Sequence, residues 1–130
     1  KQKMQEKHLY EYAVIRLVPK VEREEFLNVG IILFSKQSKY LKALFEVDEK
    51  RLAVFGKDLD KDELCNNLDS FKKICEGSKN GGPIAQLDLA SRFRWLTAVR
   101  SSIIQTSRPH PGMTSDLDKT LNRLFTELVL

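Results

Sequence analysis

The chain has 130 residues (15.0 kDa), of which 42% are hydrophobic and 31% charged. This composition is typical of a globular domain with its own core and excludes a disordered chain. No apolar run approaches the roughly 18 residues that a membrane-spanning helix needs, and no signal-peptide pattern opens the chain. We therefore expect no membrane segment and a cytoplasmic location, and the net charge of +4 does not by itself indicate nucleic-acid binding.

Three strands with short connections are predicted in the first part of the chain. Residues 10–18 are rich in β-branched and aromatic side chains and are followed by Pro19. Residues 28–35 are apolar on both faces, which is typical of a central strand, and Gly30 within them indicates a bulge or a close backbone approach. Residues 40–47 alternate apolar and polar side chains. The sequence therefore predicts an antiparallel meander.

Helical periodicity begins in the middle of the chain. Apolar side chains recur at helical spacing over residues 60–76, and Gly77 can end this helix. Residues 77–83 are rich in glycine and polar residues, and we expect them to form a flexible internal loop. Residues 87–99 place apolar side chains on one helical face and predict a second helix.

The last part of the chain predicts a strand, a loop and a helix. Residues 101–107 fit a fourth strand, and residues 108–112 (RPHPG) are expected to be a loop because two prolines and a glycine fall within five residues. A closing helix follows, capped by one of the polar residues 114–116, with an apolar stripe of Leu117, Leu121, Leu124 and Leu128.

These elements predict a single α+β domain over residues 1–130. We expect a small antiparallel sheet of about four strands with about three helices packed on it. Residues 1–8 are expected to lie outside the fold, as a start that is either disordered or left from an expression vector.

The two cysteines, Cys65 and Cys75, are predicted to be structural. They are ten residues apart in one predicted helix, so about 15 Å separates them and an intramolecular disulfide cannot form. We expect reduced thiols, as in a cytoplasmic protein. No metal-ligand spacing, nucleophile motif or phosphate-loop signature is present, so no metal site and no cofactor are predicted.

One stretch, residues 91–112, carries the candidate site. It holds four arginines and a histidine but no lysine and no acid, and the acid-free window extends over residues 89–115. Arginine forks and hydroxyl groups make charge-assisted hydrogen bonds to phosphates and carboxylates. The predicted ligand-binding residues are Arg92, Arg100, Ser101, Ser107 and His110.

Two questions about this stretch stay open on the residues alone. The arginines could instead pair with acids elsewhere, such as Glu22, Glu24 or Glu25, or face solvent. His110 lies between two prolines that restrict the backbone, so it is a candidate general acid or base, although an exposed loop histidine has the same surroundings in sequence.

Two long stretches, YEYAVIRLVPKVEREEFLNVGIILF and SRFRWLTAVRSSIIQTSRPHPG, resemble the two signature blocks of a bacterial family catalogued as domain of unknown function 3037. The resemblance covers most of the chain and is weakest over residues 48–85. In the family the second block reads Ser-Arg, Trp-Leu, Arg-Ser, Gln-x-Ser and His-x-Gly. The corresponding residues here are Ser91, Arg92, Trp95, Leu96, Arg100, Ser101, Gln105, Ser107, His110 and Gly112, and those of the first block include Arg23, Glu25, Asn28 and Gly30.

The resemblance supplies no established activity, but it implies a partner. Members of the family are often encoded beside a kinase-like protein that resembles the HipA toxins, which implies an accessory or regulatory role with such a kinase. This implication comes from the family and not from the residues.

Composition, motifs and resemblance together favour a cytoplasmic binding or regulatory module. It would hold an anionic group, either a phosphorylated small molecule or an acidic surface, and act with a protein partner. The alternative is an enzyme acting on a nucleotide or phosphate ester, with His110 as acid/base and arginines stabilising the developing charge. Non-specific nucleic-acid binding is the weaker alternative because the lysines are interleaved with acids.

Overall fold

The computed structural model describes residues 6–19, 26–53, 55, 59–98 and 102–130. The described residues form five strands, four α-helices and one short 3-10 helix, which confirms the predicted α+β class with an antiparallel sheet. The elements in chain order are β1 (His8–Leu17), β2 (Leu27–Ser35), β3 (Tyr40–Phe45), α1 (Glu49–Leu52), α2 (Lys61–Glu76), η3 (Ile84–Gln86), α3 (Leu89–Thr97), β4 (Ile104–Thr106), β5 (His110–Thr114) and α4 (Leu117–Leu128).

The sheet is built around β1 and β2, as the predicted meander requires. The order is β3-β2-β1, and β4 and β5 follow one another along the other side of β1. All strand pairs are antiparallel. Every residue of β2 from Val29 to Ser35 is buried, which confirms that its apolar character on both faces reflects a central strand.

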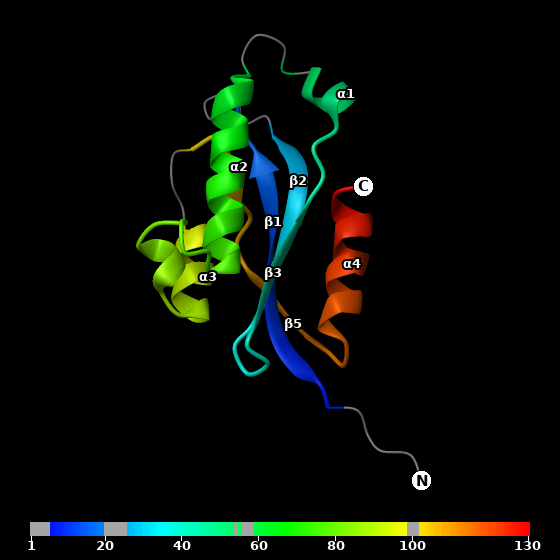
Figure 1. The fold of residues 1–130 in the computed structure, drawn as a ribbon. Coiled ribbons are helices and arrows are strands. Elements are labelled where there is room, and N and C mark those ends of the chain that lie inside the picture. Colours follow the sequence, from blue (N-terminus) through cyan, green and yellow to red (C-terminus); the bar gives the residue numbers. More distant parts are fainter. Residues whose placement is uncertain (1–5, 20–25, 54, 56–58, 99–101) are drawn as a thin grey trace.

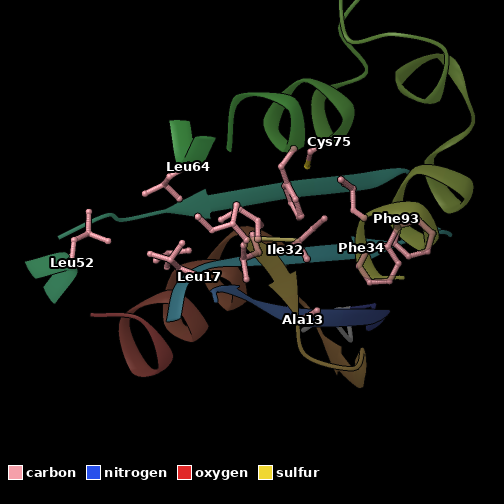
Figure 2. Packing of buried hydrophobic residues seen from close by; sticks show 14 residues of the cluster. Ala13, Leu17, Ile32, Phe34, Leu52, Leu64, Cys75 and Phe93 are labelled. Carbon is pink, nitrogen blue, oxygen red and sulfur yellow. The ribbon is translucent and has the colours of Figure 1, made fainter. Parts of the chain in front are cut away.

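Helices cover both faces of the sheet, so the domain has three layers (Figure 1). The side of α2 and α3 buries a cluster that includes Ala13, Ile15 and Leu17 of β1, and Figure 2 shows part of this packing. The side of α4 buries a second cluster that includes Val14 of β1 and Ile31 of β2. The alternation of side chains along β1 therefore assigns each residue to one helix layer.

Gly30 lies at a β-bulge, and its backbone is also close to the neighbouring strand, so both predictions for this residue are confirmed. In the pairing of β1 with β2, Ile15 lies opposite Gly30 whereas the next residue, Arg16, lies opposite Asn28, so β2 contains one extra residue. A Cβ atom on Gly30 would lie 2.5 Å from the backbone oxygen of Leu44 in β3. Only glycine fits there without a shift of the neighbouring strand.

The long helices begin and end where the sequence predicts, within two residues. Asp60 and Asp88 cap α2 and α3 through side-chain hydrogen bonds to backbone N–H groups of the first turn. Asp116 is the cap of α4. Gly77 ends α2 with a φ of 69°, the left-handed conformation that glycine adopts most readily.

Two expectations about the ends of strands are corrected. Residues 110–114 form strand β5 and not a loop, because an edge strand tolerates Pro111, whose missing N–H is not needed for the sheet. His8 is not part of a disordered start but the first residue of β1, paired with Thr114 and hydrogen-bonded through Nδ1 to Ser38 Oγ (2.6 Å). Residues 1–5 of the expected start lie outside the described residues.

Candidate functional site

Arg92 is buried in α3 and is bound to the end of α2. Only 8% of the residue is exposed, and its Nη1 atom donates hydrogen bonds to the backbone oxygens of Ile74 and Cys75, both at 3.2 Å. The last carbonyls of a helix lack partners within the helix and carry partial negative charge. The guanidinium therefore binds the C-terminus of α2, is not exposed to solvent, and forms no ion pair with a residue that the structure describes; Glu22, Glu24 and Glu25 lie outside the described residues.

Ser107 is also buried and fully engaged with the backbone. Its Oγ accepts a hydrogen bond from the N–H of Val14 (2.9 Å) and donates one to the oxygen of Arg108 (3.1 Å). The N–H of Ser107 donates in turn to the oxygen of Val14 (2.9 Å). The side chain thus takes the place of a backbone carbonyl in the pairing with β1.

A bulge separates β4 from β5 and decides where His110 points. Thr106 lies opposite Ile15 and His110 lies opposite Tyr12, so three residues of the edge (107–109) face two residues of β1 (13–14). An extra residue in one strand reverses the alternation of side chains beyond it. His110 consequently shares the face of Tyr12, where a regular strand would have turned it to the opposite face.

The imidazole of His110 is exposed and lies beside an aromatic ring. The ring centroids of His110 and Tyr12 are 5.3 Å apart, and Tyr12 packs against the cluster under α4. No hydrogen bond joins the imidazole to another described residue. An acid/base role would need such a partner to orient the ring and set its tautomer.

The structure does not bring the described members of the predicted anion site together. Arg92 lies in the α2 and α3 layer, whereas His110 lies on the face of the sheet that carries α4. The sheet separates them, and Ser107 lies in the plane of the sheet. Arg100 and Ser101 lie outside the described residues.

A groove opens instead at the end of the sheet that α3 leaves uncovered. Its volume is about 470 Å³, and the first residues of β1, the end of β2, the turn after β2, α3 and β5 line it. Figure 1 shows β1 and β5 continuing beyond α3 at this end. Leu9, Phe34 and Pro111 give the groove an apolar lining, and Phe34 stacks on Phe93 of α3 at 4.9 Å, which fixes the inner wall.

Two large apolar side chains are exposed at this end of the sheet: Leu9, which lines the groove, and Met113, which does not line it but neighbours Leu9. Leu9 of β1 and Met113 of β5 are directly opposite in the register, and 53% and 59% of these residues are exposed. Opposite residues of two antiparallel strands share one face. Leu9 also shares the face of Glu11 and Ala13, which is the face that α2 and α3 cover further along β1. The pair therefore continues the core surface past the edge of the helices.

Charged side chains border this apolar surface. Arg94 of α3 binds Glu11 of β1 in a two-pronged ion pair, with Nη1–Oε1 at 3.2 Å and Nη2–Oε2 at 2.8 Å. Lys36, in the turn after β2, also lines the groove and makes no ion pair with any residue that the structure describes. The pKa of Asp88, the cap of α3, is lowered chiefly by the backbone hydrogen bond from Ser91. The positive charge of Lys36 also lowers this pKa, so Lys36 lies near the start of α3.

Sequence reasoning did not identify this groove. Leu9 fell next to a stretch that we expected to be disordered, and Met113 followed a stretch that we expected to be a loop, so neither was assigned to a face. The available signal was Leu9, which falls on the same face as Ala13 if the first predicted strand begins one residue earlier, with the charged Glu11 between them.

Other features of the described residues give less support for a binding site. A hollow between α2, α3 and β4 has a volume of only about 80 Å³. No group of three or more His, Cys, Asp and Glu side chains comes together within the described ranges. No helix among them is long and apolar enough to cross a membrane.

Comparison with known families identifies the chain. The model of the family described as protein of unknown function (DUF3037) matches residues 12–129. The chain belongs to the DUF3037 family. The match confirms the resemblance carried by the two signature blocks. Neither a curated protein nor a solved structure matches the chain.

Proposed function

We propose that this DUF3037 domain is a cytoplasmic protein-interaction module, and that its partner docks on the groove beside α3. The observation that carries the proposal is the exposed pair Leu9 and Met113, of which 53% and 59% are exposed: Leu9 lines a groove of about 470 Å³, and Met113 lies opposite Leu9 on β5. Apolar side chains gathered on one surface and bordered by charges are typical of protein-binding surfaces.

The surroundings of the groove support binding to its surface rather than to the edge of the sheet. Pro111 offers no backbone N–H on the edge strand β5, which disfavours the addition of a further strand there. A partner would therefore recognise side chains on the face. The free cysteines, with Cys65 exposed, support a reducing compartment.

The family resemblance supplies the partner to test, a kinase that resembles the HipA toxins. The experiment is calorimetric titration of the purified domain with such a kinase encoded in the same operon. We expect the double variant Leu9→Ser, Met113→Ser to weaken binding at least about tenfold, because two half-exposed apolar side chains would lose the area that the partner covers.

The matched control is Leu87→Ser, since Leu87 is 46% exposed but neither lines the groove nor pairs with a residue that lines it. This variant should bind as the wild type does. Thermal unfolding of all three proteins checks that the fold is intact. Absence of a complex, or a complex that the double variant forms as tightly as the wild type, would contradict the proposal.

A further inference from the structure

The charges at the groove suggest which kind of segment it accepts. Two cationic side chains, Lys36 and Arg94, lie on its borders with a single carboxylate, that of Glu11. Glu11 is already bound to Arg94, whereas Lys36 forms no ion pair with a residue that the structure describes and has only the exposed carboxylate of Asp88 within electrostatic range. An apolar floor with an excess of positive charge at its borders is complementary to a segment that combines apolar and acidic side chains.

A carboxylate of a partner can replace Glu11 in its ion pair with Arg94. The side chains of Arg94 and Glu11 are 58% and 31% exposed, and ion pairs at such exposure contribute little to stability. The guanidinium of Arg94 presents a planar fork, which a carboxylate of a partner can bind in the same two-pronged way as Glu11 does. Exchange would replace one ion pair with another and release Glu11 toward solvent.

We propose that the groove binds a short acidic and apolar segment of a partner protein, whose apolar side chains cover Leu9 and Met113 and whose carboxylate displaces Glu11 from Arg94. This inference rests on the proposed function and adds the chemistry of the partner. In this arrangement Glu11 acts as an internal competitor for Arg94, and Lys36 attracts a second acidic side chain.

Selection from a displayed library of random twelve-residue peptides tests the inference without a known partner. The library is selected against the whole domain and, separately, against the variant Leu9→Ser, Met113→Ser. Peptides enriched only with the wild type bind at the groove. We expect these peptides to carry Asp or Glu beside Leu, Ile, Met or Phe.

Three single variants then measure the contribution of each charge to the affinity of one selected peptide. Arg94→Gln should weaken binding at least about tenfold, because a charge-assisted two-pronged contact is lost. Glu11→Gln should strengthen binding, since the competitor for Arg94 is removed. The matched control is Arg123→Gln in α4, because Arg123 forms a similar exposed ion pair with Glu127 away from the groove, and its replacement should leave the affinity unchanged.

The outcomes separate this inference from the proposed function. Groove-dependent peptides without acidic residues, or an affinity that Arg94→Gln and Glu11→Gln leave unchanged, would overturn the inference while the docking surface stands. If no peptide depends on Leu9 and Met113, both the inference and the docking surface fail. Enrichment of acidic and apolar peptides with opposite effects of the two variants supports both.

Discussion

Replacing Arg92 with methionine should lower the stability of the domain and leave the groove intact. Methionine keeps most of the buried aliphatic volume but removes the donor that binds the oxygens of Ile74 and Cys75. Gly77 N also donates to the oxygen of Ile74, so the main loss is a buried carbonyl of Cys75 without its partner. A buried polar group left unpaired costs about 1–3 kcal/mol, so we expect a loss near 2 kcal/mol.

Thermal unfolding measures this loss. In a domain of this size, 1 kcal/mol corresponds to a change in Tm of about 3–4 °C, so Arg92→Met should melt about 6–8 °C below the wild type. The neighbouring variant Arg94→Met is the control, because the ion pair that it breaks is exposed and should change Tm by less than about 3 °C.

The same experiment decides between a structural arginine and an anion ligand. Thermal shift is repeated with nucleotides and phosphorylated metabolites, and a ligand at 100 times its dissociation constant should stabilise the wild type by about 2.7 kcal/mol. If Arg92→Met melts with the wild type and loses the shift that an anion gives, Arg92 binds a ligand and its role at the end of α2 is wrong.

Three further variants or reagents test the packing and the titrating groups. Gly30→Ala should cost about 2 kcal/mol or more because its Cβ would overlap a backbone oxygen of β3, and a lower urea midpoint with an unchanged m-value would show it, whereas an unchanged midpoint would contradict it. The hydrogen bond from Tyr40 is the first cause of the lowered pKa of Asp118, so Tyr40→Phe should raise this pKa toward the ordinary range of an aspartate. A carboxyl group whose pKa is lower in the folded than in the unfolded state stabilises the fold above the unfolded pKa, and this stabilisation is lost as the pH falls through the folded pKa. The difference in unfolding free energy between the wild type and Tyr40→Phe should therefore shrink below about pH 4. A carboxyl titration by NMR that gives the same pKa for both proteins would refute this. Burial raises the pKa of Cys75 to about 12, so at pH 8 a thiol reagent should modify Cys65 alone in the folded domain and both thiols in urea; modification of both without urea would show that Cys75 is accessible.

Where residues repeat with a regular period, the sequence predicted the fold closely. The strand predicted over residues 10–18 is β1, whose Ala13, Ile15 and Leu17 lie in the core, and the apolar run of β2 correctly indicated a strand covered on both sides. Helix ends also depend on local residues: Gly77 was expected to end α2, and Asp116, which caps α4, was one of three candidates for that cap. Such features depend on neighbours a few residues away.

The roles of the candidate site residues depend on partners far along the chain, and the sequence could not predict these partners. The sequence indicated correctly that residues 91–112 are unusual, but burial decided what Arg92 does, and its partners are backbone oxygens 17 and 18 residues earlier. Backbone carbonyls are the same in every residue and leave no trace in the sequence. A loop was predicted over residues 108–112 because local propensity disfavours proline in strands; this holds for residues 108–109, whereas residues 110–112 pair with β1 at the open edge of the sheet.

The sequence by itself determined the family, the α+β class and which faces of the regular elements are apolar, because these follow from local periodicity and from two distinctive blocks. The tertiary structure alone decided which side of the sheet each functional side chain occupies. One extra residue between β4 and β5 reverses the side-chain alternation and places His110 across the sheet from Arg92. Leu9 and Met113 are exposed because α3 does not extend over their end of the sheet. How far α3 covers the sheet is determined by helix packing and not by composition.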